Sequence, residues 1–197
     1  MESSTEKIIR MLLTHPKQKW MQKDLAEKSN CSKAYLSKLM KKFREENIIA
    51  RPYKNQVVLI GFSKLLNKWA NMRKMQEPIY LNISLSEKEI EDSLKEEKDY
   101  ALTLFRAAWY RTKFMRTDSF EIYAGEPEKF IKNFGEKVNE PTNFIVYKGD
   151  KQIFEFIEIV EGFKLVSVVQ NYADLMSAGG SGVRVAYELA EKYDLMR

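Results

Sequence analysis

The spacing of apolar residues in the first third of the chain predicts three helices followed by a hairpin. Residues 5–14 and 21–29 place apolar residues at the spacing of one helical face. A third helix is expected after Ser32, a favourable N-cap residue, with an apolar stripe that excludes its lysines. β-prone runs at 48–51 and 57–60 then flank the turn-forming sequence PYKNQ. The stripe of the third helix consists of Leu36, Leu39, Met40 and Phe43.

The outward face of the third predicted helix is basic, with five Lys/Arg and no acidic residue between Ser32 and Arg44. A winged helix-turn-helix has this order of elements: a helix, a short turn, a capped helix and a basic hairpin. The second helix of the pair enters the major groove of DNA. Such modules also serve as protein adaptors. The predicted DNA-contacting residues are Ser32, Lys33, Ala34, Tyr35, Ser37, Lys38 and Lys41 in the helix, and Arg51, Tyr53 and Lys54 in the hairpin.

These contact residues have different expected roles. Phosphate contacts are expected from Lys33, Lys38, Lys41, Arg51 and Lys54, and they make affinity depend steeply on salt. Base edges are expected to be read by Lys33, Ala34 and Ser37 near the start of the helix. Two alternatives stay open. For Ser32, the role of a helix cap is favoured over that of a base reader, and Tyr35 either packs against the core or contacts a phosphate.

The remainder of the chain alternates between strand and helix patterns. This favours an α+β fold in which the N-terminal module precedes a domain with a mixed sheet of about four strands. We expect the module over 1–61, a helical connector over 62–77 and the α+β domain over 78–197. Strand patterns occupy 79–85, 119–124, 143–148, 153–160 and 163–169, and helix patterns occupy 86–97, 100–114, 126–135, 169–176 and 182–193.

Charge separates the two parts of the chain more clearly than composition does. The net charge is +5, but residues 1–75 hold 17 Lys/Arg against 6 Asp/Glu, a net of +11, which leaves −6 for the rest. A positive N-terminal third suggests a polyanionic partner such as double-stranded DNA. The N-terminus lacks a signal-peptide pattern, and no apolar run reaches the roughly 20 residues that span a bilayer. A cytoplasmic protein without membrane contact is therefore expected.

Enzymatic chemistry finds little support in the sequence. The single cysteine, Cys31, and the single histidine, His15, have no partner residues nearby for a metal site or a nucleophile. The sequence GGSG at 179–182 lacks the Lys-Ser/Thr ending of a phosphate-binding loop and does not follow a strand. We therefore expect no catalytic residue, no metal and no cofactor. A degenerate nucleotidyltransferase-like enzyme is the weakest alternative.

The second part of the chain contains three segments with a recognisable pattern: YALTLFRAAW, a strand opened by Asn143, and EGFKLVSVVQNYADLMSAGGSGVRVAYELAEKY. Through these segments it resembles the C-terminal domain of AbiEi-type antitoxins, the regulator half of type IV toxin-antitoxin systems. The family usually has a glycine where Leu104 or Phe105 stands, so a local contact differs here. The motif residues that carry over are Gln170, Tyr172, Asp174 and Arg184, which also have a purely structural interpretation as helix caps, helix pairs and core.

The resemblance implies a DNA-binding transcription regulator, an antitoxin-like autorepressor that binds repeated half-sites as a homodimer. Related proteins also occur as solitary regulators, so a toxin partner is implied only by analogy. The main alternative is a protein-protein adaptor or antitoxin that acts through the acidic C-terminal domain, with DNA binding secondary.

Overall fold

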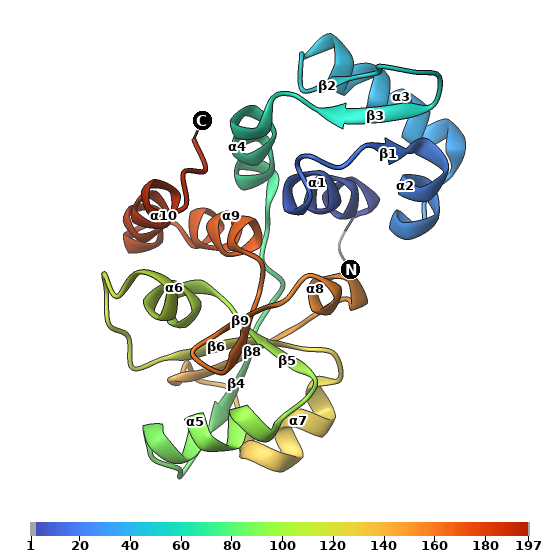
Figure 1. The fold of residues 1–197 in the computed structure, drawn as a ribbon. Helices are drawn as coiled ribbons and strands as arrows, with labels where there is room; N and C mark the ends of the chain where they lie inside the picture. The colour runs from blue at the N-terminus through green and yellow to red at the C-terminus, as the bar shows by residue number, and fades with distance from the viewer. Residues whose placement is uncertain (1–2, 197) are drawn as a thin grey trace. The chain divides into compact units, whose positions relative to one another are not determined.

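The computed structural model describes residues 3–196, which divide into two compact units (Figure 1). The first unit runs to Arg73 and includes the described residues from Asp194 onward, and the second runs from Lys74 to Tyr193. Helix α4 (Phe62–Met72), expected as part of a separate connector, belongs to the first unit. The reason is its apolar face, since Leu65, Leu66 and Trp69 are fully buried and the helix packs on α1 (Ser4–Thr14).

The first unit contains the predicted helices in the predicted order. After α1 come α2 (Gln22–Ser29) and α3 (Lys33–Glu45), and the turn between them is made by Asn30 in the left-handed conformation, φ 51°. Strands β2 (Ile49–Ala50) and β3 (Gln56–Leu59) form the predicted hairpin, shorter than the sequence suggested. A strand that the sequence did not predict, β1 (Trp20–Met21), pairs with β3 and completes an antiparallel sheet in the order β1-β3-β2.

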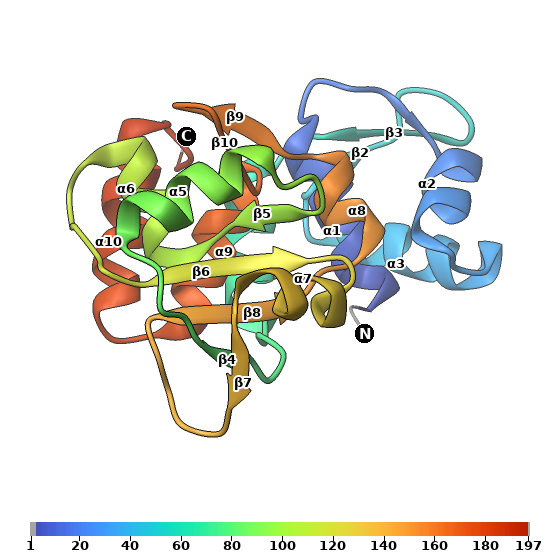
Figure 2. The ribbon, with the colours of Figure 1, turned by 90° about the horizontal axis from the view of Figure 1, so that it is seen from below.

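The second unit is a seven-stranded mixed sheet between two layers of helices (Figure 2). Helices α5 and α7 cover one face, and α6, α9 and α10 pack together on the other. The strand order is β7-β4-β8-β6-β5-β10-β9, with β6 parallel to β8 and β10 parallel to β5. The bounds in chain order are β4 (Ile79–Asn82), α5 (Glu87–Glu96), β5 (Tyr100–Leu102), α6 (Leu104–Thr112), β6 (Phe120–Ala124), α7 (Pro127–Phe134), β7 (Glu136–Val138), β8 (Phe144–Lys148), α8 (Lys151–Glu155), β9 (Glu158–Val160), β10 (Phe163–Leu165), α9 (Val168–Ala178) and α10 (Ser181–Lys192).

The expectation of about four strands was too low, because β5 lies inside a segment predicted as helix and β7 was not predicted at all. Two segments also change structure part-way. The predicted helix 100–114 begins as strand β5, which pairs with both β6 and β10 before α6 starts. The predicted strand 153–160 begins inside α8, because the Asp150 carboxylate caps this helix by accepting from the backbone N–H groups of Gln152 (2.9 Å) and Ile153 (3.2 Å). Strand β7 carried no sequence signal that predicted it. No helix among the described residues is long and apolar enough to cross a membrane.

One charged side chain holds the first unit together at its core. Glu6 closes a capping box with Ser3 at the start of α1 and accepts hydrogen bonds from Arg73 Nη1 (3.0 Å) and Trp69 Nε1 (3.4 Å). The Arg73 side chain is 3% exposed and the Glu6 side chain is 12% exposed. This pair therefore joins the first helix of the unit to the residue that follows α4.

We predict that Glu6→Ala destabilises the first unit by about 3 kcal/mol, because it removes a buried ion-pair partner of Arg73 and the acceptor of the Trp69 hydrogen bond. Urea unfolding followed by tryptophan fluorescence measures it, since Trp20 and Trp69 both lie in this unit. Glu45→Ala is the matched control. Its exposed ion pair with Lys41 spans 3.9 Å, and its loss should change stability by less than about 0.5 kcal/mol. Equal effects of the two substitutions would contradict the prediction.

Candidate functional site

The outer face of α3 and its N-cap carry seven of the ten residues that the sequence singled out for DNA contact, and the hairpin carries the other three. The helix buries Leu36, Met40 and Phe43, as its apolar stripe predicts, while Leu39 stays half-buried. Because those residues face the core, the opposite side of the helix is left to solvent. All ten predicted contact residues are exposed: Ser32, Lys33, Ala34, Tyr35, Ser37, Lys38, Lys41, Arg51, Tyr53 and Lys54.

Contacts with the start of α2 position the hairpin turn. Strand β1 pairs with β3, and the backbone N–H of Gln22 donates to the backbone oxygen of Asn55 at 2.9 Å. Arg51 donates from Nη2 (2.9 Å) and Nε (3.3 Å) to the side-chain oxygen of Gln22, when that amide is oriented with its oxygen toward the guanidinium. The turn is thus held beside the first turn of α2, which carries Lys23 and Asp24.

A groove of about 510 Å³ lies between the start of α2, the first turns of α3 and the hairpin turn. Its polar lining combines the predicted Lys33 and Ser37 with Lys23 and Asn55, which sequence reasoning did not select. Lys23 was missed because its position depends on the β1–β3 pairing, and a two-residue strand leaves almost no sequence pattern. The positive charge of Lys23 is partly balanced by Glu27, whose Oε1 lies 3.7 Å from Lys23 Nζ.

Two of the predicted contact residues have structural roles within the first unit. The Ser32 hydroxyl accepts a hydrogen bond from the backbone N–H of Tyr35 at 3.1 Å, which confirms its expected role as the N-cap of α3. The Tyr35 hydroxyl is hydrogen-bonded to the hydroxyl of Thr5 on α1, although the side chain remains 44% exposed. Tyr35 therefore fixes α3 against α1, and no observation assigns it a phosphate contact.

In the second unit, the residues that carry the family resemblance meet around Asp174, which is fully buried. Its Oδ2 accepts from the Thr103 hydroxyl at 2.7 Å and from the Tyr123 hydroxyl at 3.1 Å, and its Oδ1 accepts from Gln170 Nε2 at 2.7 Å. Thr103 belongs to the ALT sequence and Gln170 to the sequence QNYADL. Two motifs that are 71 residues apart thus share one hydrogen-bond network.

The other motif residues have separate positions. Tyr172 is 1% exposed, and burial raises the pKa of its hydroxyl. Arg184 is exposed on α10, with its guanidinium carbon 5.1 Å from the centre of the Phe114 ring. Gly179 and Gly180 turn the chain from α9 to α10 with φ of 69° and 51°, values that favour glycine. The buried motif residues serve packing, so a structural role accounts for Gln170, Tyr172 and Asp174.

Leu104 marks the departure from the family pattern. It adopts a left-handed conformation, φ 46°, at the junction between β5 and α6, where a glycine would be free of strain. The side chain is nevertheless 4% exposed, and Asn171 Nδ2 donates to its backbone oxygen at 3.0 Å. Apolar burial and this hydrogen bond hold the residue in a conformation that its side chain disfavours.

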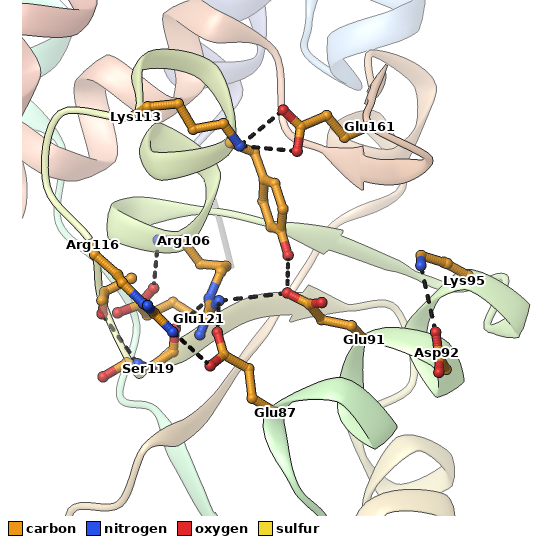
Figure 3. Close-up of polar contacts among 12 residues, drawn as sticks. Glu87, Glu91, Asp92, Lys95, Arg106, Lys113, Arg116, Ser119, Glu121 and Glu161 are labelled. Atoms are coloured by element: carbon orange, nitrogen blue, oxygen red, sulfur yellow. Dashed lines mark hydrogen bonds and ion pairs between the residues drawn. The ribbon is translucent and has the colours of Figure 1, made fainter.

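A second buried polar cluster surrounds Arg106, which is 1% exposed (Figure 3). Arg106 donates from Nη1 to Glu87 Oε1 at 2.7 Å and from Nε to the backbone oxygen of Ser119 at 2.9 Å. Its guanidinium carbon lies 3.8 Å from the centre of the Phe120 ring. These contacts lower the pKa of Glu87, chiefly through the hydrogen bond from Arg106. The Glu87 side chain is therefore a carboxylate at neutral pH.

Glu121, in strand β6, behaves in the opposite way. Burial raises the pKa of its carboxyl to about 7, although the backbone N–H of Arg106 donates to Oε2 at 3.0 Å and opposes the shift. The residue is 3% exposed. The backbone N–H that it accepts lies in the first turn of α6, so the carboxyl also satisfies an otherwise free end of that helix.

Comparison with known proteins does not assign the chain to a family. No family model matches it, and no curated protein matches its sequence. Within residues 3–196, no group of three or more His, Cys, Asp or Glu side chains is arranged to hold a metal ion. Any function must therefore be argued from the chain's own residues.

We predict that Glu121 makes stability fall as pH rises. The folded protein keeps the proton of Glu121 up to about pH 7, whereas the unfolded chain loses it near the ordinary pKa of 4.5. Between these two pKa values the folded state therefore binds more protons than the unfolded state does. The free energy of unfolding consequently decreases from about pH 5 to pH 7, by at most about 3 kcal/mol. Glu121→Gln should remove this decrease in urea unfolding measured from pH 5 to 8. The exposed control Glu140→Gln should keep the wild-type profile, and a variant at Glu121 that still follows it would refute the assignment.

Proposed function

We propose that this chain is a DNA-binding transcription regulator whose first unit is a winged helix-turn-helix. The observation that carries the proposal is the exposed face of α3, which has five basic residues and no acidic one between Ser32 and Arg44. The hairpin turn adds Arg51 and Lys54 beside the groove that Lys33 and Ser37 line. A helix and a basic hairpin on one small unit match the dimensions of a major groove and its flanking phosphates.

The charge distribution supports phosphate contact as the main source of affinity. The net of +11 in residues 1–75 attracts a polyanion, and each phosphate neutralised by a lysine or arginine releases counterions. Base discrimination then falls to the side chains at the start of α3, namely Lys33, Ala34 and Ser37. Ser32 and Tyr35 support the helix from behind through the cap and the bond to Thr5.

The resemblance to AbiEi-type antitoxins extends the proposal to an autorepressor that pairs with a toxin. What favours it is that Thr103, Gln170 and Asp174, which come from separate motifs, share one buried network. A shared network explains why these residue types recur together, although it points to a shared fold more than to a shared partner. The acidic second part of the chain, with its net of −6, is the surface on which a basic protein partner would bind.

We predict that Lys38→Ala weakens binding to all duplexes by a similar factor and reduces the slope of log affinity against log salt by about 0.9, the loss of one phosphate contact. Fluorescence anisotropy with the protein's own upstream region and with a scrambled duplex of equal length measures both quantities. The control is Lys88→Ala, which removes an exposed lysine from α5 in the second unit and should change neither.

The outcomes separate the candidate functions. Tighter binding of wild type to the upstream duplex supports a sequence-specific autoregulator. A loss in Lys38→Ala confined to that duplex would make Lys38 a base reader. Absence of binding to either duplex at low salt would refute the DNA-binding proposal and favour the adaptor, for which co-purification of a second polypeptide is the direct evidence.

A further inference from the structure

Arg51 of the hairpin is held by a residue of the neighbouring helix. The side-chain oxygen of Gln22, the first residue of α2, accepts from Arg51 Nη2 at 2.9 Å and from Nε at 3.3 Å, with the amide oriented for this contact. Nε and Nη2 lie on one edge of the planar guanidinium group, so one acceptor that binds both fixes the orientation of the plane. Gln22 is half-buried and Arg51 is exposed, so a residue anchored in the fold orients a side chain that otherwise extends into solvent.

The backbone and the side chain of Gln22 hold different parts of the hairpin. The backbone N–H donates to the backbone oxygen of Asn55 at 2.9 Å, and the preceding Met21 pairs with Gln56 of β3. These backbone contacts fix the turn whatever side chain stands at position 22, whereas the amide oxygen acts on the guanidinium of Arg51. Alanine is also the residue that a helix favours most. Removing the amide therefore frees Arg51 and leaves both the turn and α2 in place.

The held guanidinium lies beside the groove between α2, α3 and the hairpin turn. Gln22 lines this groove together with Lys23 and Lys33, and none of its lining residues in the described part of the chain is acidic. The third guanidinium nitrogen, Arg51 Nη1, has no hydrogen-bond partner within residues 3–196. A phosphate that reaches the groove therefore meets two lysines on its wall and an oriented arginine with one nitrogen left to donate.

We propose that Gln22 is a positioning residue that orders Arg51 for contact with one phosphate of the DNA strand at this groove. The role rests on the proposed DNA binding of the first unit, to which it adds a residue that no sequence pattern singled out. An arginine that is ordered before binding loses less side-chain entropy when a phosphate fixes it. Gln22 thereby raises affinity without a charge of its own, and it does so through Arg51.

A double-mutant cycle tests this role, with fluorescence anisotropy of the full chain on the upstream and scrambled duplexes. Gln22→Ala should weaken binding to both duplexes about fivefold, because one arginine is then ordered only on binding. The slope of log affinity against log salt should stay nearly unchanged in this variant, whereas Arg51→Ala should lower it by about 0.9. In the Arg51→Ala background, Gln22→Ala should cause no further loss.

Lys23→Ala is the matched control for the cycle. Lys23 lines the same groove and pairs with Glu27, so its loss should add to that of Arg51→Ala instead of disappearing in it. Gln22→Met keeps the length of the side chain without the acceptor oxygen and should bind DNA as Gln22→Ala does. Unfolding midpoints equal to that of wild type show that the variants fold.

Nitrogen-15 relaxation of the Arg51 Nε–H group in the free protein tests the contact without DNA. The group should be ordered in wild type and mobile in Gln22→Ala and Gln22→Met. A mobile Arg51 in free wild type overturns the proposal, as do losses from Gln22→Ala and Arg51→Ala that add in the double variant while wild type binds DNA. Absence of wild-type binding to either duplex would instead refute DNA binding by the first unit, and the role of Gln22 with it.

Discussion

The Asp174 carboxyl group lies wholly inside the second unit and accepts hydrogen bonds from three side chains on three different segments. Thr103 follows β5 and precedes α6, Tyr123 lies on β6, and Gln170 is one turn earlier on α9. A buried carboxyl without such donors would cost several kcal/mol, so these hydrogen bonds fix α9 against β6 and the start of α6. The neighbouring Arg111 adds to the constraint, since it donates to Asn171 Oδ1 (3.3 Å) of α9 and to Glu158 Oε2 (2.8 Å) of β9.

Because α9 is fixed in this way, the positions of the neighbouring helices of the second unit depend on it. Helix α10 packs on α9 and α6, the two glycines set the turn between α9 and α10, and Leu104 accepts a strained conformation so that α6 starts directly over the sheet. Arg106 of α6 reaches Ser119, just before β6, and Glu87 of α5, and so links α6 to the helix layer on the opposite face of the sheet. That contact also fixes Glu87 at the start of α5.

The first unit uses the same principle with one ion pair. Glu6 holds α1 to the end of α4 through Arg73 and Trp69, and the apolar sides of α2 and α3 close over this frame. The lysines of α3 are then left outside by exclusion, since the helix has only one apolar stripe. The exposed basic face is therefore a direct consequence of packing.

Local patterns were sufficient to predict the helices of the first unit, the cap at Ser32 and the exposed basic residues, because each depends on neighbours within one or two turns. The same patterns failed where a strand is two or three residues long, as at 20–21 and 136–138, and where a segment changes structure, as at 100–112 and 151–160. Those choices depend on partners far along the chain: β5 is a strand because β6 and β10 flank it. The meeting of Thr103 with Asp174 likewise came only from the tertiary structure, because contacts between distant residues leave no period in the sequence.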